Sequence, residues 1–360
     1  MAPARNEIVR ILCEIWEDLL AVEVNPDDDF FDLGGYSLLV VNVVSEARKR
    51  GLELPAAILQ TNGTPAAIAD AIVAAGAGEE AVTASADPDF TSVWETGLSP
   101  LETEAARTLV PFVTEGTGTP VFCFHWGTGN VRFMADLVDG FRGDRPAYGL
   151  EMVGMWTRER PSLSIVEMAA RYLREIREVQ PEGPYLFVGP CAGGRIAYEI
   201  ARQLEQDGQQ VAVLAVINSM PPGSTELDPA WGLNELYNFR LASLRSRFEV
   251  ADLVAEQQRV MDGMVEIAWL DAGVDPADLH WRQAVWAAGI FAQEHYEPRR
   301  YGGEITVFQL AENAARPEAD WGRMAASTET HTFESPGTLP LLRESAFAEL
   351  LAKKLAAYER

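Results

Sequence analysis

The chain has 360 residues, a formal net charge of −25 and an apolar fraction of 48%. This length predicts two or three domains, and the apolar fraction is large enough for sizeable cores. The negative charge argues against nucleic acid or an anionic membrane as partners. No apolar run is long enough to cross a bilayer, and Cys13, Cys123 and Cys191 form no disulfide framework, so we expect a protein of the reducing cytoplasm.

The N-terminal part of the sequence predicts a small helical domain. Apolar residues recur at helical spacing between Ile8 and Leu19, and the pattern predicts an all-α, four-helix bundle over residues 1–76. A stretch rich in Ala, Gly and acidic residues then predicts a linker over residues 77–106. Trp94 and its apolar neighbours interrupt that linker, which indicates that part of it lies against a neighbouring surface.

From residue 107 to residue 360, strands alternate with helices, which predicts a mostly parallel sheet covered on both faces. The expected elements are a hairpin of strands 109–113 and 120–125, a helix near 131–141, a strand near 147–152, a helix near 165–179, strands 185–190, 211–217, 304–310 and 328–333, and a helix from about 345. Residues 224–295 are too long for a simple connection. Their helical, aromatic-rich pattern predicts a lid over the carboxyl edge of the sheet.

A reactive thiol is predicted in the middle of the chain. The apolar strand from Tyr185 runs into Gly189-Pro190-Cys191-Ala192-Gly193, and a helical pattern follows. This is the layout of a nucleophile elbow, in which a strained turn between a strand and a helix exposes a reactive side chain above an α/β-hydrolase sheet. The usual serine is replaced by Cys191, which we expect at the N-terminus of the following helix.

A second polar residue is predicted at a helix N-terminus in the small domain. Ser37 follows two glycines and precedes a second helical stripe. It could cap that helix, or the polarised helix end could hold a phosphate attached to its hydroxyl. The residues alone favour neither interpretation.

The segment from Phe30 to Leu38 resembles the carrier-protein motif of nonribosomal peptide synthetases, and residues 120–125, the elbow and residues 296–303 resemble their terminal thioesterase domain. The resemblance implies 4′-phosphopantetheine on Ser37, within an acidic carrier that has 5 basic and 12 acidic residues. It also implies partners: upstream condensation and adenylation domains, a phosphopantetheinyl transferase, and docking of the carrier on the thioesterase of the same chain.

The same resemblance locates a catalytic triad whose three positions are altered. Cys191 replaces the nucleophilic serine, Asn218 occupies the position of the aspartate, and Thr338 lies about where the histidine is expected. The oxyanion hole is expected at the backbone N–H groups of Ala192 and Gly127.

These changes predict release of a bound chain without hydrolysis. Thiolate attack on a thioester tolerates the loss of a base, whereas attack by water does not. We therefore expect transfer of the chain to Cys191 and cyclisation to a lactam or lactone. Two further assignments remain as alternatives. His125, which is more often structural at this position, could serve as a relocated base, and Glu312 could serve as a relocated acid. The alternatives are a degenerate pseudo-thioesterase that binds the tethered chain, or a non-release reaction on that chain.

Overall fold

The computed structural model describes residues 4–20, 22–30, 33, 43, 46–47, 50–52, 54, 63–77, 87–98, 107–224, 227 and 230–358. The chain divides into two compact units. One contains Met1–Ser92 and Thr225–Gly263, and the other contains Val93–Ser224 and Met264–Arg360. Ser37 and most of the helix expected after it lie outside the described residues.

The first unit begins with α1 (Arg5–Leu20) and α4 (Pro65–Ala77), which pack against each other. α1 buries one apolar face, and its Trp16 ring lies 4.9 Å from the ring of Phe30. The amide of Phe30 donates to the carbonyl of Gly63 at 2.8 Å. These contacts confirm helices at both ends of the expected bundle, and the count of four helices stays a prediction.

Helices also form in the long segment expected as a lid. They are α9 (Leu233–Phe248), α10 (Gln257–Glu266), the short η2 (Pro276–Asp278) and α11 (Leu279–Glu294). α9 belongs to the first unit, where the Tyr237 hydroxyl donates to the Pro88 carbonyl at 3.2 Å. α11 belongs to the second unit. The helical pattern is thus confirmed, and the role as a lid stays a prediction.

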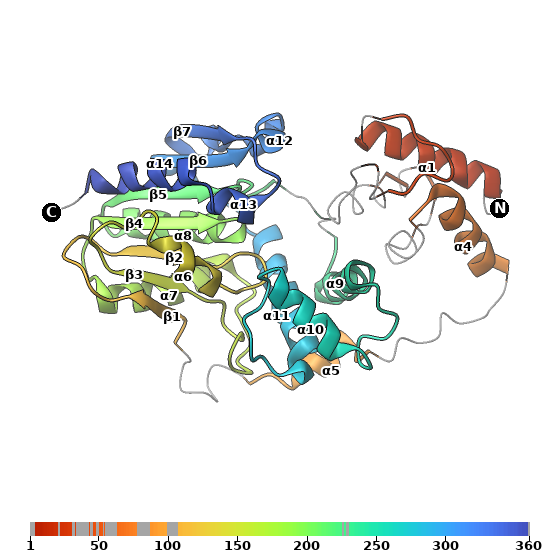
Figure 1. Ribbon diagram of the computed structural model, residues 1–360, viewed down its shortest axis with the longest axis horizontal. Coiled ribbons are helices and arrows are strands. Elements are labelled where there is room, and N and C mark those ends of the chain that lie inside the picture. Colours follow the sequence, from red (N-terminus) through yellow and green to blue (C-terminus); the bar gives the residue numbers. More distant parts are fainter. Residues whose placement is uncertain are drawn as a thin grey trace. The chain divides into compact units, whose positions relative to one another are not determined.

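The second unit is built on a seven-stranded sheet of order β1-β3-β2-β4-β5-β6-β7 (Figure 1). The strands are β1 (Leu109–Val113), β2 (Val121–Phe124), β3 (Ala147–Leu150), β4 (Tyr185–Pro190), β5 (Val211–Ile217), β6 (Tyr301–Leu310) and β7 (Ala325–Phe333). All neighbouring pairs are parallel except β1 with β3. The sheet is therefore mixed, with one antiparallel edge strand.

The predicted hairpin of residues 109–113 and 120–125 is wrong. Both strands form, but β1 pairs with β3, with Leu109 opposite Leu150, and β2 lies between β3 and β4. The turn-forming residues between β1 and β2 are compatible with a hairpin, yet β2 is buried along its whole length. A strand buried in this way gains more from a central position with two parallel neighbours than from an edge pairing.

Helices cover both faces of the sheet (Figure 1). α7 (Ile165–Val179) and α8 (Ala192–Gln206) lie together on one face, and Ser164 caps the start of α7 by accepting from the Glu167 amide. η1 (Arg132–Met134), α6 (Ala135–Val138), α13 (Thr338–Leu342) and α14 (Ser345–Ala356) contribute buried side chains to the core on the other face. The remaining short helices are α5 (Phe90–Glu95), α12 (Ala311–Ala314), η3 (Pro317–Ala319) and η4 (Trp321–Arg323).

Part of the expected linker is anchored to the second unit. The Trp94 ring stacks on Trp281 of α11 at 6.0 Å, and the Leu98 amide donates to the Arg158 carbonyl at 2.6 Å. Arg160 donates from Nε to the Trp94 carbonyl at 2.9 Å. These contacts agree with the prediction that the apolar residues of the linker lie against a surface.

Among the helices that the structure describes, none combines the length and the apolar character that a membrane-spanning segment needs.

Candidate active site

The turn that holds Cys191 has the geometry of a nucleophile elbow. β4 ends at Pro190, α8 begins at Ala192, and Cys191 between them has φ 49° and ψ −121°. A residue other than glycine in this region stores strain of roughly 1–3 kcal/mol. The Cys191 amide donates to the Ile217 carbonyl at 2.9 Å, and the Gly194 amide donates to the Cys191 carbonyl at 3.1 Å. These bonds hold the strained turn while the Cys191 side chain is exposed.

Two glycines are required by the close approach of backbone segments around the elbow. A Cβ atom on Gly189 would lie 2.5 Å from the Gly193 carbonyl oxygen. A Cβ atom on Gly193 would lie 2.6 Å from the carbonyl oxygen of His125. Either distance is too short for a non-bonded carbon–oxygen contact, so only glycine allows β4, α8 and the end of β2 to meet. The spacing that identified the elbow in the sequence therefore has a steric cause.

The groups expected to form the oxyanion hole lie in suitable segments. Ala192 is the first residue of α8, where amide groups lack acceptors within the helix. Gly127 follows the end of β2, and the nearest atom to a Cβ placed on it would be Trp286 Nε1 at 3.9 Å. A side-chain carbon at position 127 would thus make only an ordinary contact with Trp286. The assignment of these two amides stays a prediction.

Asn218 and Thr338, expected at the positions of the acid and the base, are in direct contact. Asn218 Nδ2 donates to Thr338 Oγ1 at 2.8 Å. Asn218 has φ 44°, and its amide donates to the Phe308 carbonyl at 2.6 Å. Because Pro190 of β4 is paired with Ile217 of β5, the residues that follow them, Cys191 and Asn218, leave neighbouring strands at the same edge of the sheet.

Asn313 is part of this arrangement and was not predicted from the sequence. It lies in α12, three residues after the end of β6, and its Nδ2 donates to Asn218 Oδ1 at 2.6 Å. The Leu310 amide donates to the same oxygen at 3.4 Å. With its oxygen occupied by two donors, the Asn218 carboxamide can only direct its NH2 group toward Thr338. A polar residue shortly after a strand at the same sheet edge is the only sequence signal for Asn313.

His125 is engaged in the interior. Its Nδ1 lies 2.8 Å from the Trp126 carbonyl and its Nε2 lies 3.0 Å from the Tyr172 hydroxyl. The side chain is 2% exposed, and burial lowers the pKa of His125 to about 4. A neutral ring that donates from Nδ1 and accepts at Nε2 satisfies both contacts. This geometry favours the structural alternative for His125 over a role as the base.

The other histidines of the chain lie in α11, after α11 and in β7. His280 is the second residue of α11 and is buried. His295 stacks on Phe291 with ring centroids 3.9 Å apart. His331 Nε2 lies 2.8 Å from Glu329 Oε1. Glu312, the alternative acid, is exposed in α12. The partner of Asn218 is thus a hydroxyl group and not an imidazole.

Two arginines of α9, Arg240 and Arg245, do not form a simple solvent-exposed face of the helix. Arg240 is 6% exposed, and burial lowers its pKa to about 9. Arg245 forms an ion pair with Asp87. These side chains have structural surroundings within the first unit.

Comparison with known families places a domain in each part of the chain. Residues 10–72 match the phosphopantetheine attachment site, and residues 119–273 match the thioesterase domain. The first match indicates a covalently attached 4′-phosphopantetheine. The chain is a carrier domain followed by a thioesterase domain of α/β-hydrolase type.

Curated relatives are large synthetases. Malpibaldin synthetase of Mortierella alpina is 34% identical over 210 residues, which are 58% of this chain and 3% of that protein. A dimodular nonribosomal peptide synthase of Bacillus subtilis is 33% identical over 213 residues, which are 59% of this chain and 8% of that protein. The chain therefore spans less than a tenth of the length of either relative.

Solved structures support the fold. A four-domain nonribosomal peptide synthetase, crystallised with AMP and glycine, matches with a TM-score of 0.57 and 23% identity, covering 99% of this chain and 26% of that one. The type II thioesterase of the borrelidin cluster matches with a TM-score of 0.52 and 20% identity, covering 70% of this chain and 99% of that one.

Proposed function

We propose that this carrier–thioesterase didomain of the nonribosomal peptide synthetase type receives an acyl or peptidyl chain on Cys191 and releases it by attack of a nucleophile within that chain. The observation that carries the proposal is the hydrogen bond from Asn218 to Thr338. The bond supports the proposal because Asn218 and Thr338, the residues proposed for the positions of the acid and the base, bind each other. Neither group accepts a proton at neutral pH.

The phosphopantetheine arm is proposed to be attached to Ser37, which lies outside the described residues. The described residues before Ser37 fit such a site. Phe30 is fully buried and its amide is hydrogen-bonded to Gly63, so the segment that contains Ser37 begins from a fixed position. The arm supplies the substrate as a thioester. Modification of Ser37 would require a phosphopantetheinyl transferase, and upstream condensation and adenylation domains would supply the chain.

Transfer to Cys191 needs no separate base. The sulfur of Cys191 forms a bond to the acyl carbon while the bond from that carbon to the carrier sulfur breaks. The proton of the Cys191 thiol passes to the departing sulfur. Exchange between two thioesters is close to thermoneutral, and the N-terminus of α8 favours the thiolate. The amides of Ala192 and Gly127 are proposed to stabilise the oxyanion that forms on the way.

In the release step, water and a nucleophile within the bound chain compete for the Cys191 thioester. Water must lose a proton as it attacks, and Thr338 cannot take that proton because its hydroxyl remains protonated. A neutral amine already carries a reactive lone pair, so it can attack the Cys191 thioester and close a lactam. The nitrogen bonds to the acyl carbon, the carbon–sulfur bond breaks, and the amine proton returns to the Cys191 sulfur. A hydroxyl group would give a lactone, but it must lose its proton as water must, so the absence of a base favours the lactam.

The test is intact-protein mass spectrometry of the didomain with a loaded arm, combined with analysis of the released product. We expect the acyl mass to appear on Cys191, to vanish in Cys191→Ala, and to persist in the control Cys13→Ala, which removes a half-buried thiol of α1. The expected product is cyclic.

Three results would contradict this function. Chiefly linear acid would show that water is the preferred nucleophile. Acyl mass that never leaves Ser37 would indicate a module that only binds the tethered chain. A change in the mass of the tethered group without transfer would indicate a non-release reaction.

A further inference from the structure

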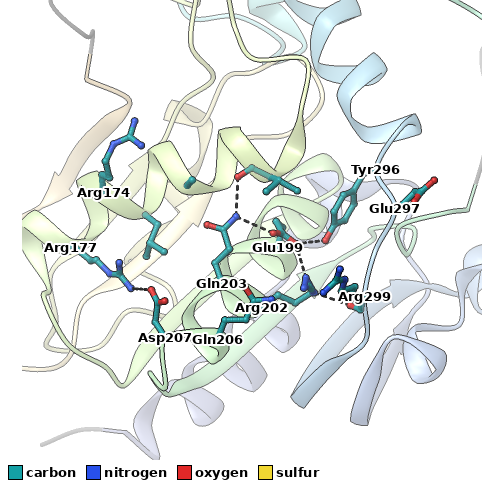
Figure 2. Close-up of a pocket in the computed structure, with 13 residues that line it drawn as sticks. Arg174, Arg177, Glu199, Arg202, Gln203, Gln206, Asp207, Tyr296, Glu297 and Arg299 are labelled. Carbon is teal, nitrogen blue, oxygen red and sulfur yellow. Dashed lines mark hydrogen bonds and ion pairs between the residues drawn. The ribbon is translucent and has the colours of Figure 1, made fainter.

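A hollow of about 620 Å³ lies in the second unit, apart from the elbow. It is lined by α7, by the C-terminal half of α8 and by the segment from Tyr296 to Arg299 (Figure 2). Cys191, Asn218 and Thr338 are not among its lining residues. The volume falls in the range of small-molecule sites, which is about 300–1,000 Å³. Nothing in the proposed acyl transfer uses this hollow.

The floor of the hollow is preorganised by a buried hydrogen-bond network. Glu199 is 3% exposed and accepts from the Tyr296 hydroxyl, from Gln203 Nε2 at 3.0 Å and from Arg202 Nη1 at 3.4 Å. Gln203 also donates to the Val166 carbonyl at 2.9 Å and so connects α8 with α7. Figure 2 shows these side chains directed toward Glu199. A ligand entering the hollow would meet fixed groups, which lowers the entropic cost of binding.

The lining of the hollow is rich in arginine, although the chain as a whole is acidic. Its lining contains four arginines and three carboxylates, whereas the whole chain has a net charge of −25. Arg177 is paired with Asp207, and Arg202 is bound to Glu199. Arg174 and Arg299 are exposed, and the structure gives their guanidinium groups no ion pair among the described residues. In Figure 2 these two arginines lie on opposite sides of the Glu199 network.

This arrangement suits an elongated anion with an apolar part. Guanidinium groups bind phosphate and carboxylate through paired N–H donors. Two such groups on opposite sides of the hollow can contact one ligand only if it is longer than a single ion. The side chains of Val166, Ala170 and Leu173 add apolar surface to the lining. We propose that this hollow is a binding site for an organic phosphate about the size of a nucleotide.

Isothermal titration calorimetry of the intact didomain tests the site, with adenosine triphosphate as the probe and citrate as a carboxylate comparison. We expect saturable binding of one nucleotide per chain, and citrate binding at least about tenfold weaker. Arg174→Gln and Arg299→Gln should each weaken nucleotide binding by about tenfold or more, which is the loss of one charge-assisted hydrogen bond. The matched control is Lys353→Gln, which removes an exposed positive charge from α14 and should bind as the wild type does.

The outcomes separate this proposal from the acyl-transfer proposal. Cys191→Ala should bind the nucleotide with unchanged affinity, and the double variant Arg174→Gln, Arg299→Gln should still acylate Cys191. Absence of saturable binding, unchanged affinity in that double variant, or citrate bound as tightly as the nucleotide would each overturn the site. Thermal unfolding of the double variant, expected near the wild-type midpoint, checks that a loss of binding is not a loss of fold.

Discussion

The ends of the neighbouring strands β4 and β5 are both held by close contacts, but they present side chains of different chemistry. At the end of β4, a strained turn and two closely packed glycines present a thiol. At the end of β5, two donors fix Asn218 so that it binds a hydroxyl group. In the proposed reaction the first end attacks a carbonyl carbon, whereas the second end holds a hydrogen bond and removes no proton. Under the proposed function, the difference means that a scaffold of hydrolase type can present a nucleophile without the means to activate water.

The largest effect is expected at the elbow. Cys191→Ser keeps the turn but replaces the thiol by a hydroxyl group, which needs a base to attack at neutral pH. Because Asn218 and Thr338 supply no base, we expect the rate of acyl transfer to fall by about 10³-fold or more. The decay of the acyl mass on the carrier arm measures this rate. Transfer at a rate near that of the wild type would show that a base is present after all.

The buried histidine behind the elbow gives a pH prediction. The pKa of His125 is about 4 in the folded protein, and about 6.5 is its ordinary value. The unfolded chain therefore binds more protons between these values, and the free energy of unfolding should fall as the pH is lowered from about 6.5 toward 4. The loss amounts to roughly 3 kcal/mol.

Urea denaturation as a function of pH measures this loss. His125→Gln removes the titrating ring, so its curve should be flatter than that of the wild type over the same interval. An equal slope in both proteins would assign the pH dependence to other groups.

Restoring an acid and a base at the end of β5 should change how the bound acyl chain is released. In the double variant Asn218→Asp, Thr338→His, the introduced carboxylate can accept from Asn313 and Leu310, and the introduced imidazole can take a proton from water. General-base catalysis contributes about 10²-fold or more. We expect the ratio of linear acid to cyclic product to rise by that order, as measured by liquid chromatography. An unchanged ratio would show that Asn218 and Thr338 do not determine whether the product is linear or cyclic.

The smallest effect concerns Asn313. Asn313→Ala removes one of the two donors to Asn218 Oδ1 and should reduce the free energy of unfolding by about 1 kcal/mol. It should also loosen the orientation of Asn218 and lower the rate of release, while acylation of Cys191 is unchanged. Asn313→Gln, which keeps a donor, is expected to recover part of the release rate. If both variants release normally, Asn313 is structural only.

The local parts of this molecule could be predicted and the long-range contacts could not. The elbow was predictable because Gly189, Cys191 and Gly193 lie within one short stretch of sequence, between an apolar strand and a helical pattern. The pairing of β1 with β3 was missed, since turn residues report local preference while burial decides which strands become neighbours. Asn313 and the arginine-lined hollow were missed for the same reason: side chains from separate segments converge only after the sheet has formed.

The contrast among the thiols has a practical consequence for labelling. Cys123 lies in the core, and burial raises its pKa to about 12. The Cys13 thiol is partly buried in α1, and burial raises its pKa as well. Cys191 alone among the three is exposed. A mild alkylating reagent, or an electrophile shaped like the peptide chain, would therefore mark the elbow first and report directly whether it is occupied.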